Sequence, residues 1–383
     1  MKRSVRLADV AKAARVSQGT ASNVFNRPEI VRAEVRDRVE KWAQKLGYSG
    51  PDPKGRLLRA GRVNAIGILA AKDMSRFFND PFQRLLMAGI AEVCDEHGAG
   101  IALVSATSGR DSAAWTVATA LVDGFIVHCL EDGNRLTALV QKRNLPFVTI
   151  DLATGPGASS VLIDDQRGAG MAARHLLGLG HRRIGLLCLD TRGDGRFGPL
   201  DAERLRSARY KVVRDRVAGY AAALAARGID LERLPMVEVP NDRQVAVGYA
   251  GELLDRAPDT TAIIAMSDVL ALAAIEAARQ RGRRVPDDLS VIGFDDVPDA
   301  ALATPPLTTI AQPIADKGRH AARLIFELIF EDGPQRNEIL RVKLVERAST
   351  ARCRVSPRRP SVRRESTRGP GRSRNATPGA GRP

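Results

Sequence analysis

The pattern of apolar and polar positions divides the chain into three parts. From residue 63 to about residue 350, short apolar runs alternate with helical patterns. Before this part, residues 7–26 and 32–47 carry apolar residues at the spacing of short amphipathic helices. After it, residues 351–383 are rich in Arg, Pro, Gly and Ser, and this segment is predicted to be a disordered tail because it has too few apolar residues to form a core.

The central part has the pattern of an α/β protein. Helices are expected near 82–97 and 168–179, and the apolar runs predict strands over 65–70, 101–105, 125–129, 147–150, 161–163, 184–189, 236–239, 262–266, 291–294 and 308–310. Strands that alternate with helices predict parallel sheets covered on both faces. Because about ten strands exceed what one compact sheet needs, we expect two Rossmann-like lobes with a ligand between them at the carboxyl ends of the strands.

The N-terminal part predicts a helix-turn-helix. A first helix over 7–14 is followed by a tight break at Arg15, and Ser17 stands at the N-cap of a second helix over 18–26. In such a unit the first residues of the second helix face base edges in the major groove. The side chains predicted to read DNA are those of Ser17, Gln18, Thr20, Ser22, Asn23 and Asn26. A fragment of an ordinary helical bundle is the alternative for the two helices alone.

The run from Leu7 to Asn26, together with the third helical pattern over 32–47 and Tyr48, resembles the headpiece of the lactose-repressor (LacI/GalR) family of bacterial transcription regulators. The resemblance implies an all-α DNA-binding headpiece over 1–62 that ends in a hinge helix at about 55–62. In that hinge, Leu58 would insert into the minor groove, with Leu57 as the alternative.

Three positions of the headpiece depart from the family pattern. Arg15 replaces the usual turn glycine and would adopt a backbone conformation that is unfavourable for a residue with a side chain. Gly19 offers no side chain at a recognition position. Asn23 replaces a common arginine with a short amide suited to adenine. The operator is therefore expected to be related to the family's usual palindrome without being identical to it.

The resemblance continues over the central part, in ordered runs at 121–126, 175–184, 216–220, 266–268, 285–296 and 306–310. It implies the fold of type I periplasmic sugar-binding proteins, whose chain crosses between two lobes three times. We place these crossings near Asp164, Gln312 and Leu340. The first lobe would then hold about 63–164 and 312–340, and the second lobe about 165–311 and 341–350.

Four residues are candidates for binding a small-molecule effector, by default a sugar, since sugar hydroxyls suit carboxylate acceptors and a planar arginine. Asp295 ends a predicted strand, and Arg216 opens a helix that by resemblance faces the same cleft. Phe82 resembles a pocket-lining aromatic, although Phe77, Phe78 or simple packing under a loop remain alternatives. Asp268 follows a strand too, but it could instead cap the alanine-rich helix after it.

The net charge of +15 is concentrated at the two ends of the chain. Residues 1–62 and residues 351–383 each carry a net charge of +9, whereas the residues between them carry −3. This distribution places the polyanion contact at the ends. Phosphate contacts are expected from Lys2, Arg3, Arg6, Arg32 and Arg62. The tail is either a nonspecific DNA arm or an extension without a selected role.

Other classes of protein find little support. The four cysteines are scattered without a C-x-x-C pair, the first residues lack the apolar core of a signal peptide, and no run approaches transmembrane length, so we expect a cytoplasmic protein with no membrane partner. The histidines show no metal spacing and catalytic motifs are absent, so no metal, cofactor or enzymatic activity is expected. His128 and Cys129 are interpreted as core residues of a strand.

The run 193–198 spells G-x-G-x-x-G after a strand, but no helix opens within it. We therefore interpret it as part of a long surface insertion, loop-like from Pro199 and then helical through Arg227.

The sequence as a whole predicts a homodimeric or tetrameric, effector-responsive transcription factor, most simply a repressor that binds a pseudo-palindromic operator. A solute-binding protein without DNA function is the main alternative, and a sugar-processing enzyme is a more distant one.

Overall fold

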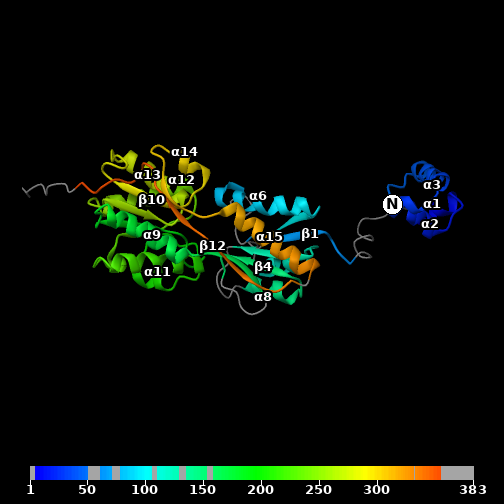
Figure 1. The fold of residues 1–383 in the computed structure, drawn as a ribbon, viewed down its shortest axis with the longest axis horizontal. Helices are drawn as coiled ribbons and strands as arrows, with labels where there is room; N and C mark the ends of the chain where they lie inside the picture. The colour runs from blue at the N-terminus through cyan, green and yellow to red at the C-terminus, as the bar shows by residue number, and fades with distance from the viewer. Residues whose placement is uncertain are drawn as a thin grey trace, which may run out of the picture.

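The computed structural model describes residues 5–50, 61–70, 78–105, 110–128, 135–152, 158–331 and 333–354 (Figure 1). Several predictions lie outside these residues: the hinge leucines Leu57 and Leu58, the phosphate contacts Lys2 and Arg3, and the tail beyond Arg354. Among the described residues, no helix is both long enough and apolar enough to cross a membrane.

The N-terminal part forms a three-helix unit, as predicted. Its helices are α1 (Leu7–Ala13), α2 (Gln18–Asn26) and α3 (Ala33–Leu46), with a short 3-10 turn, η1 (Pro28–Ile30). Their apolar faces meet in one small core, formed by Val10, Ala11, Ala14, Ala21, Val24, Val39 and Ala43. The Ser17 hydroxyl oxygen accepts a hydrogen bond from the Thr20 N–H at 3.0 Å, which confirms the predicted N-cap. Arg15 adopts a φ of 55°, so the expected strain in the turn is present.

The first of two sheets has six parallel strands in the order β12-β5-β4-β3-β1-β2. These strands are β1 (Ala65–Ala70), β2 (Gly100–Ser105), β3 (Gly124–His128), β4 (Phe147–Ile150), β5 (Ser159–Ile163) and β12 (Asn337–Leu340). Side chains alternate between the two faces of the sheet. Ile126 packs against helices α6 (Pro81–Glu96) and α15 (Ile314–Phe330). Its neighbours Phe125 and Val127 pack on the opposite face, with α7 (Arg110–Thr119) and α8 (Arg135–Lys142).

The second sheet has seven strands in the order β13-β11-β10-β9-β6-β8-β7. They are β6 (Ile184–Cys188), β7 (Gly198–Pro199), β8 (Met236–Glu238), β9 (Ala262–Ala265), β10 (Ser290–Asp295), β11 (Thr308–Ala311) and β13 (Lys343–Val345). The edge strands β7 and β13 pair antiparallel to their neighbours, and the other strands are parallel. One face is covered by α9 (Asp165–Gly178) and α11 (Lys211–Ala225), and the other by α12 (Arg243–Arg256) and α13 (Asp268–Gln280).

The chain passes between the two sheets three times: after β5, after β11 and after β12. We call the six-stranded sheet with its helices the first lobe and the seven-stranded sheet with its helices the second lobe (Figure 1). The second lobe also carries three short helices, α10 (Ala202–Arg206), η2 (Leu231–Arg233) and α14 (Pro298–Leu302). The observed fold is thus a helical headpiece followed by a two-sheet α/β core, as the sequence predicted.

Two details predicted for the segment after β6 are wrong. The insertion after β6 does expose residues 193–196, but Pro199 belongs to strand β7 rather than to a loop, because β7 pairs with the edge of β8. The following helices are α10 and α11, and α11 ends at Ala225 instead of continuing through Arg227.

Candidate functional site

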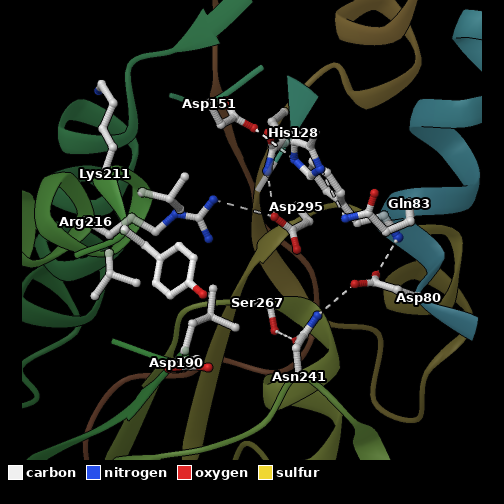
Figure 2. A pocket seen from close by; sticks show the side chains of 16 residues that line it. Asp80, Gln83, His128, Asp151, Asp190, Lys211, Arg216, Asn241, Ser267 and Asp295 are labelled. Carbon is white, nitrogen blue, oxygen red and sulfur yellow. Dashed lines mark hydrogen bonds and ion pairs between the residues drawn. The ribbon is translucent and has the colours of Figure 1, made fainter. Parts of the chain in front are cut away.

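A cavity of about 110 Å³ lies between the two lobes (Figure 2). Parallel strands of both sheets end here, and the first residues after them supply much of its lining. From the first lobe come Asp80, Phe82, Gln83, His128 and Asp151; from the second lobe Leu189, Asp190, Tyr210, Lys211, Val212, Val213, Arg216, Asn241, Ser267 and Asp295; and from the crossing after β11 Gln312. The cavity therefore lies where the sequence predicted a ligand site.

The structure brings three of the four predicted effector residues, Phe82, Arg216 and Asp295, to this cavity. Arg216 lies in the second turn of α11 rather than at its start. Of the three candidate phenylalanines, Phe82 lines the cavity. Phe78 is exposed and does not line it, and Phe77 lies outside the described residues. Asp268 does not reach the cavity.

Asp268 is fully buried at the first position of α13, where Ser267 is the N-cap. Its carboxylate accepts hydrogen bonds from the Val297 N–H at 2.9 Å and from the Thr309 hydroxyl at 2.5 Å. Burial raises the pKa of Asp268 well above its ordinary value. The prediction of an effector contact is therefore wrong for this residue, because its oxygens bind neighbouring elements of the second lobe. The alternative prediction, that Asp268 caps the following helix, is closer to the structure, because Asp268 begins α13. The N-cap itself is Ser267.

Arg216 is held rigidly from several sides. Its guanidinium Nε donates to the Asp165 carboxylate at 2.8 Å, and a second nitrogen donates to the Met266 carbonyl oxygen. The guanidinium carbon lies 3.6 Å from the centre of the Phe294 ring. Another guanidinium nitrogen is 3.8 Å from Asp295 Oδ1 (Figure 2). These contacts fix a planar cation against one wall of the cavity.

Asp295 ends β10 in an uncommon backbone conformation, with a φ of 122°. Burial raises the pKa of the Asp295 carboxyl to about 7, although the neighbouring Arg216 cation acts in the opposite direction. The Gln312 amide donates to Asp295 Oδ1 at 2.6 Å. A carboxyl in this position can accept from a ligand hydroxyl when ionised or donate to the ligand when protonated.

Gln312 connects Asp295 to a buried ion pair in the first lobe. The Lys317 ammonium is fully buried and donates to both oxygens of Asp151, at 2.9 and 2.8 Å, and to Gln312 Oε1 at 2.6 Å. Burial acts to raise the pKa of Asp151, but the Lys317 ammonium and His128 outweigh it and hold that pKa below its ordinary value. A continuous polar path therefore runs from Lys317 to Arg216.

The opposite side of the cavity is bridged by Asp80 and Asn241 (Figure 2). Asp80 is the N-cap of α6, where one carboxylate oxygen accepts from the Phe82 N–H at 3.0 Å. Its other oxygen accepts from the Asn241 amide at 3.2 Å, across the gap between the lobes. Asn241 in turn accepts a hydrogen bond of 2.7 Å from the Ser267 hydroxyl.

His128 was predicted to be a core residue, and it is buried, but it also lines the cavity. Its ring stacks on Phe82 with 5.5 Å between ring centres, and its Nδ1 lies 3.3 Å from the Gln83 amide nitrogen. Cys129 lies outside the described residues. The sequence interpretation also missed three other lining residues near strand ends. Asp151 and Gln312 directly follow β4 and β11, and Asp190 is the second residue after β6. A polar residue within two positions of the end of a predicted strand was the signal that could have found them.

The residues predicted to read DNA lie on the polar side of α2 and at its N-terminus. Gln18 and Asn26 are exposed, while Ala21 and Val24 turn into the three-helix core. Two hydrogen bonds order this polar side: one of 2.8 Å joins the hydroxyls of Ser17 and Thr20, and one of 3.0 Å joins Asn26 to Ser22. Arg6, the N-cap of α1, is exposed as well, and Asn23 is partly exposed.

Within the described part of the chain, no group of three or more His, Cys, Asp or Glu residues is placed to hold a metal ion. Cys94 and Cys188 are buried free thiols, and burial raises the pKa of the Cys94 thiol to about 11.

Two family models match the chain. A model described as "Bacterial regulatory proteins, lacI family" matches residues 6–50, and one described as "Periplasmic binding protein-like domain" matches residues 173–350. Among curated proteins, the chain is 40% identical over 330 residues to the HTH-type transcriptional regulator Rv3575c of Mycobacterium tuberculosis, covering 85% of this chain and 91% of the relative.

Three solved structures have a similar fold. A lac repressor dimer bound to operator and the anti-inducer ONPF superposes with a TM-score of 0.71 at 27% identity, over 91% of this chain and 100% of that one. A complex of the transcriptional regulator CelR with cellobiose gives 0.65 at 28% identity, over 90% and 100% of the two chains. A LacI family regulator from Enterococcus faecium with bound ribose gives 0.63 at 27% identity, over 76% and 100%.

Proposed function

The chain belongs to the LacI family of DNA-binding transcriptional regulators, and we propose that it is a repressor controlled by a small molecule bound between its two lobes. The observation that carries this proposal is the presence of two sites on one chain. The exposed polar side of α2 offers hydrogen-bonding groups suited to base edges, and the cavity between the lobes offers a separate polar site.

In the proposed DNA complex, two copies of the chain bind the two halves of a pseudo-palindrome, so that protein symmetry matches DNA symmetry. The operator complex of the lac repressor dimer supports a homodimer. The proposed base contacts come from Ser17, Gln18, Thr20, Ser22, Asn23 and Asn26, with Arg6 on phosphate and Leu58 as the minor-groove wedge. The headpiece and hinge would then occupy residues 1–62.

The proposed effector is a sugar, held by Arg216 and Asp295 with Phe82 against its ring. The cellobiose and ribose complexes of similar regulators support this class of ligand. An effector that binds one arrangement of the lobes more tightly than another shifts the balance between the two arrangements. Such allosteric coupling between two sites typically amounts to about 1–3 kcal/mol.

Selection of bound fragments from sheared genomic DNA of the source organism, at near-physiological salt, tests the DNA-binding part. We expect enrichment of a few sites that share a palindrome of roughly 14–20 base pairs. The variant Asn23→Ala should lose affinity for the selected site by about 1–3 kcal/mol if this side chain contacts a base. The matched control Gln44→Ala, an exposed amide on α3, should bind as the parent chain does.

Recovery of diffuse, salt-sensitive fragments without a shared site would contradict the proposal and favour the solute-binding alternative. Replacing Leu57 and Leu58 separately by alanine tests which leucine inserts into the minor groove. Only the variant that lacks the inserted leucine should bind the selected operator more weakly.

A further inference from the structure

We propose that Asp80 and Asp190 act as a charge filter that restricts the effector to an uncharged, single-ring polyhydroxyl compound and rejects its phosphate esters. The inference rests on the proposed function in one respect: it takes the cavity between the lobes as the effector site. It adds the charge and the size of the ligand, and it assigns a role to two carboxylates that the sequence interpretation did not select.

The filter follows from the balance of charges around the cavity. Its described lining includes four carboxylates, those of Asp80, Asp151, Asp190 and Asp295. Two of these are compensated: Asp151 by the buried ammonium in contact with both its oxygens, and Asp295 by the guanidinium 3.8 Å away. Among the described residues, neither Asp80 nor Asp190 forms an ion pair.

The lining cations are already engaged by other carboxylates. Arg216 donates to Asp165 from within the second lobe, and Lys211 forms an i,i+4 ion pair with Asp215. A phosphate group entering the cavity would therefore meet two uncompensated carboxylates and no uncommitted lining cation among the described residues. Because desolvated like charges repel strongly, phosphate esters are disfavoured.

The uncompensated carboxylates suit hydroxyl groups instead. Ionised carboxylates only accept hydrogen bonds, and each ring hydroxyl can donate one. Asp190 Oδ1 accepts from the backbone N–H groups of Arg192 and Gly193, at 3.1 and 2.7 Å, and Oδ2 has no partner among the described residues. Gln83 adds a neutral acceptor, since its side-chain oxygen is buried at the cavity without a partner.

The backbone that carries Asp190 is locked in place without a ligand. The next residue, Thr191, is fully buried and donates through both its N–H and its hydroxyl to Glu238 Oε1, at 2.6 and 2.8 Å. Arg204 bridges Glu238 to Asp194, with two hydrogen bonds of 2.9 and 2.8 Å to the Asp194 carboxylate. The insertion after β6 therefore presents Asp190 in a fixed position, so that its charge cannot easily move away from a ligand.

The volume of the cavity sets the size of the ligand. A cavity of about 110 Å³ is somewhat smaller than the ~150 Å³ engineered cavity that accommodates benzene in another protein. A cavity of this volume favours a ligand with one ring over a ligand with two linked rings. Phe82, stacked on His128, provides a flat apolar wall for the face of such a ring.

Calorimetric titration of the full chain in the absence of DNA tests the proposal. The probes are single-ring sugars and carbocyclic polyols, including D-ribose and D-glucose, each paired with its monophosphate ester, and cellobiose as the two-ring probe. We expect at least one uncharged single-ring probe to bind, with its phosphate ester at least 100-fold weaker and cellobiose no tighter than the ester. Asp190→Asn should reduce the ratio between the dissociation constants of the ester and the sugar at least tenfold.

The matched control is Asp201→Asn, which removes the same charge from the same insertion at an exposed helix cap that does not line the cavity. This control should leave the ratio between the dissociation constants of ester and sugar unchanged. Circular dichroism should confirm that both variants are folded. The proposal is overturned if no uncharged single-ring probe binds, or if an ester or cellobiose binds as tightly as the single-ring sugars. It is also overturned if Asp190→Asn leaves the ratio between the dissociation constants of ester and sugar unchanged. The titration needs no DNA, and the selection of operator fragments needs no ligand. A negative result for the charge filter is therefore distinguishable from a negative result for the proposed DNA binding.

Discussion

Replacing Lys317 by methionine removes a fully buried ammonium while keeping a side chain of similar length. In the parent chain this ammonium donates to both oxygens of Asp151 and to Gln312 Oε1. The variant leaves the buried Asp151 carboxylate without its cation. Removing one partner of a buried ion pair costs roughly 3–5 kcal/mol, so Lys317→Met should lower the free energy of unfolding of the first lobe by about that amount.

Thermal unfolding at neutral pH measures this loss. A change of 1 kcal/mol shifts Tm by roughly 2–4 °C for domains of ~150–250 residues, so the variant should melt at least ~6 °C below the parent chain. The control is Arg319→Met on the same helix, because Arg319 pairs with Glu92 and Asp316 at the surface. Such exposed pairs contribute about 0–1 kcal/mol. The double variant that also carries Asp151→Leu should recover much of the loss, since it removes both buried charges.

The pH dependence gives a second measure of the same ion pair. The pKa of Asp151 is lower in the folded chain than in the unfolded chain, so its contribution to stability is present above about pH 4 and is lost as the pH falls. The Tm difference between parent and Lys317→Met should therefore shrink on acidification. A variant that melts within ~2 °C of the parent at neutral pH, or a double variant no more stable than the single one, would refute the reasoning.

Three further variants test other parts of the chain by thermal or urea unfolding. Gly89→Ala should lower the free energy of unfolding by about 1–3 kcal/mol, because the added Cβ would lie 1.9 Å from the Ala315 carbonyl oxygen. Gly178→Ala is the control, because the space around its Cβ is open, and it should not destabilise the protein. Equal melting temperatures for the two variants would contradict this prediction. Arg15→Gly should stabilise the headpiece by up to ~1 kcal/mol because it relieves the positive φ. Burial raises the pKa of Asp295 to about 7, so the contribution of this carboxyl to stability falls as the pH rises from about 4 to 7. Asp295→Asn should remove this pH dependence of the free energy of unfolding. Parallel pH profiles of stability for the parent and the variant would contradict this prediction.

The strands that could be predicted from the sequence are those that bury side chains on both faces. All five residues of β3 and all four of β4 are buried, and both strands appear in the sequence as mainly apolar runs. The strands β12 and β13 were missed because they lie at sheet edges and carry only exposed and partly buried side chains. Ile339 in β12 is 65% exposed, so its hydrophobicity carried no information about a core.

The site was less predictable than the fold, for a physical reason. Asp151 and Asp190 are 39 positions apart and follow strands of different sheets, so only the three crossings between the lobes bring them to one cavity. His128 and Asp268 show the two opposite errors. A buried position on an apolar strand did not exclude His128 from the cavity. A position a few residues after a strand did not place Asp268 there, because Val297 and Thr309 bind its carboxylate.

The polar path through the cavity explains how binding and lobe arrangement can be linked. Lys317 belongs to the first lobe and Arg216 to the second, and Gln312, in a crossing between the lobes, connects them by accepting from Lys317 and donating to Asp295. A ligand hydroxyl bonded to Asp295 therefore acts on the same carboxyl that helps hold the lobes in this arrangement. A ligand can shift an equilibrium only by the difference between its free energies of binding to the two states. Contacts to Asp295, and to Asp80 through its bridge to Asn241, depend on the relative position of the lobes and so can supply such a difference, whereas contacts confined to one lobe would bind the ligand without switching the protein.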